Sequence, residues 1–163
     1  KIFDLDYNQL KIFIHKQSYI HAIIKFSNGL TKILIHDTNM TIPIFNSLYP
    51  KFEKKIKSNK LNSLILNNLN LTDVNIARFP VVNIIKKLPK QDSLFETVLI
   101  SANDTLVDLF LNKKINFNDI SKQLIKASNK KEFMKYKLIK PKNIQQIEKL
   151  AKYVSLKITS LSV

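Results

Sequence analysis

The chain has 163 residues, 45% of them hydrophobic, which suffices for one domain, or one and a small appendage, with a buried core. Because it contains no cysteine, disulfide frameworks and thiolate zinc sites are excluded, and a cytoplasmic location is expected. No apolar run approaches the ~18 residues of a membrane span, and no secretory signal opens the chain. Since the sequence starts at Lys1 rather than Met, we expect it to be part of something longer.

The formal net charge of +15 is unevenly distributed. Residues 1–50 carry 5 Lys against 3 acids, whereas residues 51–163 carry 22 basic residues against 9 acids. Only Arg78 is an arginine, although bidentate recognition of phosphate and guanine favours arginine over lysine. Lys, Asn and Ile are all abundant, so an AT-rich coding sequence explains the charge better than a nucleic-acid partner does.

Three segments rich in Ile, Phe and Leu predict β-strands, at residues 10–14, 19–26 and 30–36. Asn28-Gly29 separates the last two and favours a two-residue type I′ turn, in which both residues have positive φ. The second and third strands should therefore form a tight hairpin.

A two-residue turn fixes which residues of this hairpin lie opposite each other. Lys25 then faces Lys32, and His21 faces His36, on a side of the hairpin that we expect to be solvated at its turn end. The residues expected to pack inward are Ile20, Ala22, Ile24 and Phe26.

After Pro50 comes an irregular stretch rich in Asn and Lys, at residues 51–73, and beyond it the hydrophobic period is helical. Helices are expected to start at Pro80, after the capping-box pattern of residues 93–96, near Asn118 and after Asn143. The buried face of the last helix is expected to contain Ile144, Ile147, Leu150, Ala151, Val154 and Ile158. The predicted class is α+β, with short β-strands and a hairpin followed by a small C-terminal helical bundle.

Histidine is the scarce reactive residue type. His21 and His36 alone would make a poor metal site, and Asp37 would be needed to complete it, so a half-exposed polar pair is the preferred interpretation. His15 ends a strand and precedes the polar residues 16–18, which makes it the best single site candidate.

Two further patterns bear on ligand binding. Gly29 is the only glycine and belongs to the hairpin, so a Gly-rich phosphate loop is excluded from this sequence. Residues 122–142 carry eight Lys and one acid, with Phe133 and Tyr136 between them. The alternative function is therefore a Lys-rich, non-enzymatic module that binds nucleic acid or an anionic membrane surface, although a solvated helix face explains the run better.

Four motifs occur in a fixed order between about residues 3 and 125. They are Ile14 to His21 with Asn28-Gly29, Asn39 to Ile44 with Tyr49-Pro50, Arg78-Phe79-Pro80, and Ser101 to Asp104 with the following segments 110–112 and 115–120. In this order they resemble the family of 1-deoxy-D-xylulose 5-phosphate reductoisomerase. Lys16, Thr41 and Asp104 stand where that family has Pro, Arg and Glu.

The resemblance implies an enzyme of isoprenoid precursor synthesis. The intact enzyme would isomerise a phosphorylated deoxyketose on a divalent metal (Mg or Mn) and reduce the product with NADPH to 2-C-methyl-D-erythritol 4-phosphate. It would act as a homodimer, with no specific nucleic-acid or membrane partner. Residues 1–50 would be the C-terminal portion of the catalytic domain, residues 51–73 a linker and residues 74–163 a C-terminal α-helical bundle.

The resemblance also implies roles for individual residues. His15 would be the catalytic-site residue that lines the substrate pocket, Met40 would lie beside the nicotinamide, and His21 would support its strand. The nucleotide-binding domain and the acidic metal ligands would precede Lys1, so no metal ligand is expected in this chain. Alone, it should be inactive and bind neither NADPH nor metal tightly.

Overall fold

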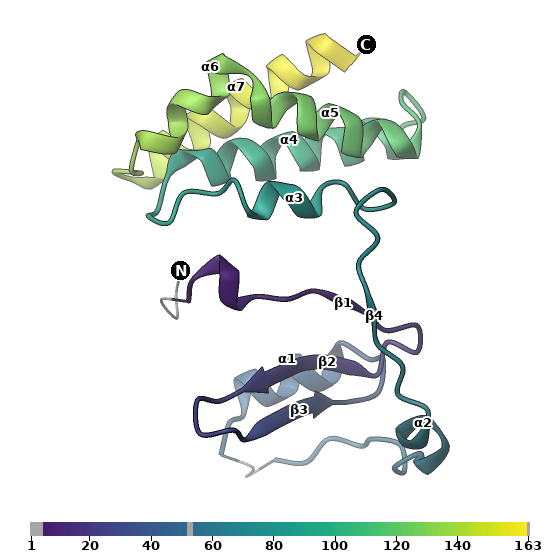
Figure 1. Cartoon of the computed structure of the whole chain (residues 1–163). Helices are drawn as coiled ribbons and strands as arrows, with labels where there is room; N and C mark the ends of the chain where they lie inside the picture. Colours follow the sequence, from purple (N-terminus) through teal and green to yellow (C-terminus); the bar gives the residue numbers. More distant parts are fainter. Residues whose placement is uncertain (1–4, 52–53, 163) are drawn as a thin grey trace. The chain divides into compact units, whose positions relative to one another are not determined.

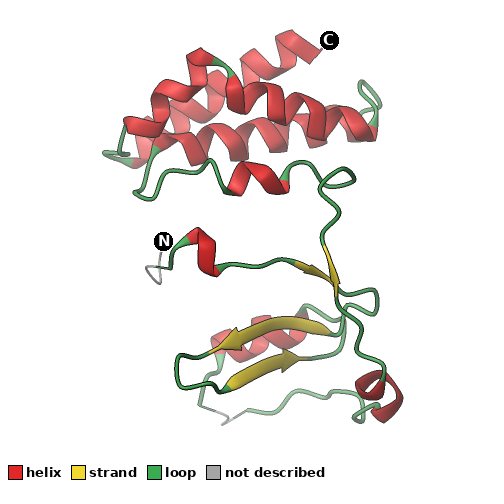
Figure 2. Ribbon diagram, viewed as in Figure 1, coloured by secondary structure: helices red, strands yellow, loops and turns green. Residues whose placement is uncertain are grey.

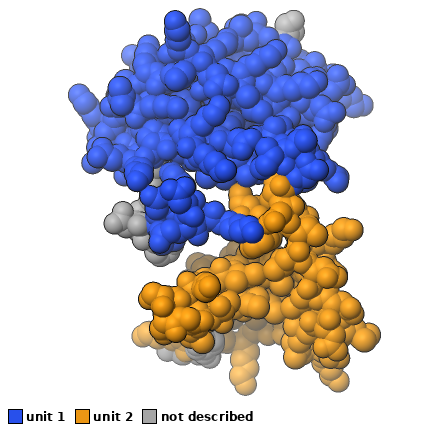
Figure 3. Space-filling model, in the orientation of Figure 1, with its two compact units in different colours: residues 1–11, 75–163 blue, residues 12–74 orange. Residues whose placement is uncertain are grey.

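The computed structural model describes residues 5–51 and 54–162 of the chain. The described residues leave out positions 1–4 of the predicted catalytic portion, positions 52 and 53 of the predicted linker and position 163 of the predicted bundle. The chain divides into two compact units, coloured separately in Figure 3. Unit 1 comprises residues 1–11 and 75–163, and unit 2 comprises residues 12–74.

Unit 2 contains two small antiparallel sheets and two helices (Figure 1). Its elements are β1 (Phe13–Ile14), β2 (Ile20–Lys25), β3 (Thr31–Ile35), α1 (Thr41–Leu48), α2 (Ser63–Asn67) and β4 (Thr72–Asp73). β1 pairs with β4, and β2 pairs with β3. Both α2 and β4 lie in residues 51–73, the stretch expected to be irregular. Through β4 this stretch pairs with β1, the first strand of the unit.

The β2–β3 hairpin forms as predicted, but the predicted turn and register are wrong. Phe26 N donates to Leu30 O at 2.8 Å, so the loop has three residues rather than two, and Lys25 pairs with Thr31 instead of facing Lys32. The Asn28 side-chain oxygen accepts from Leu30 N at 3.1 Å, and Gly29 alone supplies the left-handed φ, at 88°. These features match a type I turn followed by a glycine bulge.

The hairpin buries less apolar surface than the alternation predicts. Ile24 is 52% exposed and Phe26 is 39% exposed, so the expectation that they pack inward is wrong. Among the described residues of unit 2, only Tyr19 is buried, with 7% of its surface exposed. The cause is that a two-stranded sheet needs a further layer to cover its apolar side chains.

Unit 1 is a helical bundle with short connections, shown in red and green in Figure 2. Its elements are the 3-10 helix η1 (Tyr7–Gln9), α3 (Val82–Ile85), α4 (Leu94–Leu111), α5 (Phe117–Asn129), α6 (Lys131–Met134), the 3-10 helix η2 (Lys135–Leu138) and α7 (Ile144–Ser162). α4 is the central helix and packs against α5, η2 and α7. With the hairpin of unit 2, this bundle confirms the α+β class.

The core of unit 1 follows the helical periodicity of the sequence. Along α4 the buried side chains recur at helical spacing, and they include Val98, Ala102, Leu106 and Leu109. On α7 the prediction fails for the first turn: Ile144 is 70% exposed and Ile147 is 36% exposed, because this helix joins the core cluster only from Leu150 onward.

Side-chain caps lie at the starts of α4 and α7. The Ser93 hydroxyl accepts from Phe95 N at 3.2 Å and donates to the Glu96 carboxylate, while Asn143 Oδ1 accepts from Gln146 N at 2.9 Å. Both caps were expected from the sequence. In the part of the chain that is described, no helix is both long and apolar enough to cross a membrane.

Candidate functional site

His15 lies directly after β1 and is held by a distant part of unit 2. Its Nδ1 lies 2.9 Å from the carbonyl oxygen of Asn70, which precedes β4 by two residues. The pairing of β1 with β4 brings these positions together across 55 residues of sequence. A tight turn follows, in which Ser18 N donates to His15 O at 3.1 Å and Ser18 adopts a left-handed φ of 52°.

The two ring nitrogens of His15 have different roles. A carbonyl oxygen only accepts, so we assign the ring hydrogen to Nδ1, and Nε2 of the neutral ring then carries a lone pair. Nε2 is buried and has no hydrogen-bond partner among the residues that the structure describes. Buried polar atoms are normally hydrogen-bonded, so an unpartnered Nε2 marks His15 as a candidate functional residue.

Gln17 adds a second tie between the same two segments. Its Nε2 donates to the carbonyl oxygen of Asn68 at 3.2 Å. The turn after β1 is thus anchored twice to the segment before β4, at residues that sequence reasoning did not identify. No sequence signal marks Asn68 and Asn70, because they contribute backbone carbonyls that any residue would supply.

His21 and His36 lie side by side, as predicted, although the register is different. A bulge between Ile20 and Ala22 places the two imidazole rings in a stack, with centroids 3.5 Å apart and planes 16° from parallel. Their Nδ1 atoms lie 3.0 Å from Tyr19 O and 2.6 Å from Asp37 O, respectively.

This stack favours the polar pair over the metal site. Zinc binds a ring nitrogen at about 2.0 to 2.1 Å along the lone pair, which lies in the ring plane. Nearly parallel rings cannot direct two such lone pairs at one ion between them. Among residues 5–51 and 54–162, no group of three or more His, Cys, Asp or Glu side chains could hold a metal ion.

Met40 occupies the N-cap position of α1, a helix that the sequence analysis did not predict. The side chain is 67% exposed, and the helix start is stabilised instead by Asn39, whose Oδ1 accepts from Thr41 N at 2.9 Å. In the described part of the chain, neither a hydrogen bond nor a ring contact joins Met40 to His15. Both roles that the resemblance implies for these two residues remain predictions.

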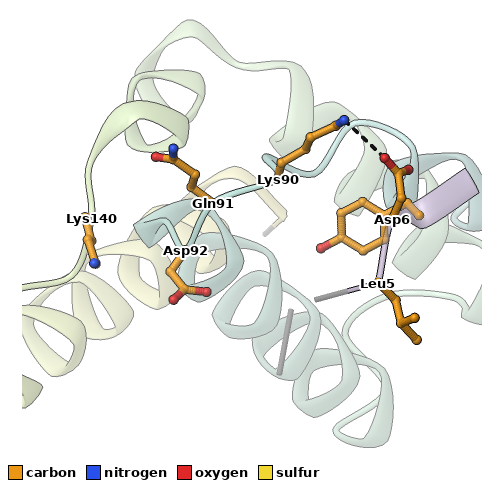
Figure 4. Close-up of a pocket in the computed structure, with 7 residues that line it drawn as sticks. Leu5, Asp6, Lys90, Gln91, Asp92 and Lys140 are labelled. Atoms are coloured by element: carbon orange, nitrogen blue, oxygen red, sulfur yellow. Dashed lines mark ion pairs between the residues drawn. The ribbon is translucent and has the colours of Figure 1, made fainter. Parts of the chain in front are cut away.

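A cavity of about 580 Å³ occurs in unit 1 and is lined by charged residues of both signs. Figure 4 shows Lys90 reaching toward Asp6, with Nζ and Oδ2 3.1 Å apart. The hydrogen bond from Asn8 N, together with Lys90, holds the pKa of Asp6 below its ordinary value. The other lining residues are Leu5, Tyr7, Gln91, Asp92 and Lys140. The two acids and two lysines of the lining balance in formal charge.

Comparison with known proteins identifies the family. Residues 36–155 match the model of the DXP reductoisomerase C-terminal domain. The 1-deoxy-D-xylulose 5-phosphate reductoisomerase of Pelagibacter ubique (strain HTCC1062) is 60% identical over all 163 residues, which cover 42% of that protein. The Exiguobacterium sp. (strain ATCC BAA-1283 / AT1b) enzyme of the same name is 30% identical over 74% of this chain and 32% of its own length. The chain thus spans about two fifths or less of these relatives.

Solved structures agree in fold. A reductoisomerase from Zymomonas mobilis in complex with NADPH superposes with a TM-score of 0.79 at 23% identity, over 99% of this chain and 41% of that one. A DOX-P reductoisomerase in complex with NADPH, fosmidomycin and magnesium gives a TM-score of 0.84 at 21% identity, over 99% and 40%. Taken with the match over residues 36–155, these findings mean that the chain belongs to the 1-deoxy-D-xylulose 5-phosphate reductoisomerase family and carries its C-terminal domain.

Proposed function

We propose that this chain is the C-terminal part of an NADPH-dependent 1-deoxy-D-xylulose 5-phosphate reductoisomerase. The intact enzyme would produce 2-C-methyl-D-erythritol 4-phosphate for isoprenoid precursor synthesis. The observation that carries the proposal is the 60% identity to a reductoisomerase over the entire chain. Residues 1–50 would end the catalytic domain, residues 51–73 would link it to the bundle, and residues 74–163 would form the bundle.

The chain's own residues do not fit the metal or the phosphates of the cofactor. The described residues contain no cluster of three metal-ligating side chains, and the only glycine belongs to the hairpin loop. A divalent metal (Mg or Mn) and NADPH would therefore be held mainly by segments of the intact protein that are not in this sequence. Met40, exposed at the start of α1, would contact the nicotinamide.

His15 would act in the substrate pocket through Nε2. Asn70 O holds the ring by Nδ1, and Nε2, which has no partner among the described residues, would accept a hydrogen bond from a substrate hydroxyl. His21 would support the strand through its stack on His36. The remaining substrate contacts would come from outside this chain.

The intact protein would be a cytoplasmic homodimer. Apolar side chains of the hairpin support this proposal, since Ile33 is 49% exposed and Leu34 is 56% exposed in a sheet of only two strands. Such a sheet is marginal by itself and gains stability from a further layer or further strands.

A chimeric enzyme tests the proposed activity. The chain replaces the matching 42% of the Pelagibacter ubique protein, and turnover is followed as oxidation of NADPH that depends on 1-deoxy-D-xylulose 5-phosphate. We expect an active chimera, and we expect His15→Phe to lower kcat/KM by about a hundredfold, because the ring loses its acceptor nitrogen. Lys16→Gln, next in sequence, is the matched control and should change kcat/KM less than threefold.

The result that contradicts the proposal is a folded chimera that binds NADPH but does not turn over the substrate. A second measurement concerns the chain alone, for which isothermal titration should show no tight NADPH binding. Micromolar affinity of the 163-residue chain for NADPH would overturn the division of roles proposed here.

A further inference from the structure

Three lysines form a stripe along α5 and its C-cap. Lys122 and Lys126 lie on one face of the helix, about 6 Å apart along its axis, and Lys130 follows directly after the last helical residue. Within the described residues, none of the three forms an ion pair. Like charges at this spacing repel each other and weaken the helix, so three lysines in this arrangement call for an explanation.

The helix dipole explains only part of the stripe. Lys126 lies in the last turn of α5 and Lys130 directly follows the helix, where positive charge is favourable. Lys122 lies in the middle of the helix, where the dipole has little effect. Its position next to the other two indicates a different role.

The three lysines line a cavity of about 330 Å³ between α5 and the end of α7. Apolar atoms of Ala127 and Ile158, both buried, and of the more exposed Leu161 line the same cavity. Gln123, also in the lining, accepts a hydrogen bond from the hydroxyl of Ser162, and this bond joins α5 to α7.

The charge of the cavity is strongly positive. Asp119 is the only acid among the described residues of the lining, and its Oδ2 already accepts from Asn116 N at 3.0 Å in the cap of α5. Three lysines therefore line the cavity against one carboxylate that is engaged in the cap. A carboxylate ligand would offset only one of them, whereas a phosphate monoester carries between one and two negative charges and several acceptor oxygens.

We propose that this cavity binds a small phosphate ester with a short aliphatic chain. The phosphate would lie among Lys122, Lys126 and Lys130, and the aliphatic chain would lie on Ala127, Ile158 and Leu161. The volume falls within the lower range of small-ligand sites. The inference concerns the bundle alone and does not depend on the proposed enzymatic function.

Titration of the 163-residue chain, followed by amide NMR shifts at constant ionic strength, tests the proposal. The probes are n-hexyl phosphate, inorganic phosphate and n-hexanol. We expect n-hexyl phosphate to bind at least about tenfold more tightly than either other probe, because only it uses both parts of the lining. The shifts should map to the second half of α5 and the last turns of α7.

Variants separate a site from diffuse attraction. Lys122→Gln/Lys126→Gln should weaken n-hexyl phosphate binding about tenfold, and Leu161→Ser should weaken it while leaving the binding of inorganic phosphate unchanged. Lys149→Gln/Lys152→Gln removes the same charge from α7 outside the cavity and should have little effect; circular dichroism checks that each variant is folded. Equal binding of phosphate and its hexyl ester, equal effects of the two double variants, or tighter binding of a DNA duplex by the same lysines would overturn the proposal.

Discussion

Glu132 connects α6 to α7 through its carboxylate. It accepts a hydrogen bond from the hydroxyl of Tyr153 and lies 3.8 Å from Lys157 Nζ, both on α7. The hydrogen bond from Tyr153, helped by the charges of Lys157, Lys130 and Lys135, lowers the pKa of Glu132 below its ordinary value. The same bond raises the pKa of Tyr153. The pair therefore stabilises the folded state while Glu132 is ionised and Tyr153 is neutral.

Replacing Tyr153 by Phe should lower stability in a pH-dependent way. The lowered pKa of Glu132 contributes stability that is present above the ordinary glutamate value and is lost as pH falls through the folded value. The raised pKa of Tyr153 contributes stability that is lost only as pH rises through its folded value. Urea denaturation should therefore show a lower midpoint for Tyr153→Phe than for the wild type at about pH 7, and a smaller difference at about pH 3. Equal deficits at both pH values would contradict this account.

For single residues, the sequence identifies a candidate site residue more readily than the contacts that position its side chain. His15 stands out by its place after a strand and among polar neighbours, and the structure does give it a buried, unpartnered Nε2. Its support by Asn70 O was not predictable, because a contact across 55 residues leaves no local pattern. Whether His15 and Met40 act together is likewise outside what local sequence determines.

Among the elements, the hairpin shows how a loop fixes a register. Asn-Gly predicts a type I′ turn with positive φ at both residues, but only Gly29 has a positive φ. The Asn28 side chain instead accepts a hydrogen bond from Leu30 N, and the loop gains a residue. A single residue then shifts every cross-strand pair of β2 and β3. The bulge at His21 restores the contact with His36, which is why that prediction holds in spite of the register error.

Gly29→Ala should destabilise this loop by about 1 kcal/mol, because an alanine at a φ of 88° is conformationally strained. An added Cβ meets no atom within 4 Å, so steric clash contributes nothing. Gly29→Asn should cost less, since asparagine tolerates the left-handed region better. NMR shifts of β2 and β3 measured against urea concentration give the comparison; an equal loss for both variants would mean that backbone strain is not the cause.

Helices were more predictable than short strands. The apolar periodicity of α4 and the caps at Ser93 and Asn143 are local patterns in the sequence. The first corresponds to a buried helix face in the structure, and the two caps correspond to helix starts. β4 has only two residues and exists because β1 is available to pair with it. Its assignment needs the partner strand, which periodicity cannot supply.

For the whole molecule, the two units differ in how much they bury. Unit 1 has a cluster of twelve buried residues centred on α4, whereas unit 2 has one buried residue among those described. The charge and periodicity change near Pro50 indicated two kinds of structure in the chain. It did not indicate that residues 12–74 would fold as one unit, because that depends on the non-local pairing of β1 with β4.

Amide hydrogen exchange of the 163-residue chain should reflect this difference. Amides in α4 and α7 are protected by the core and open only with the bundle, whereas those of β2 and β3 are hydrogen-bonded in a sheet with little burial. We expect the slowest α4 amides to exchange at least about a thousandfold more slowly than those of the hairpin, as a bundle stability of about 5 kcal/mol implies. Leu106 and Ile33 report on the two units. Hairpin protection that rises with chain concentration would point to cover by a second copy, whereas hairpin amides as slow as those of α4 in dilute solution would show that the hairpin is stable without further cover.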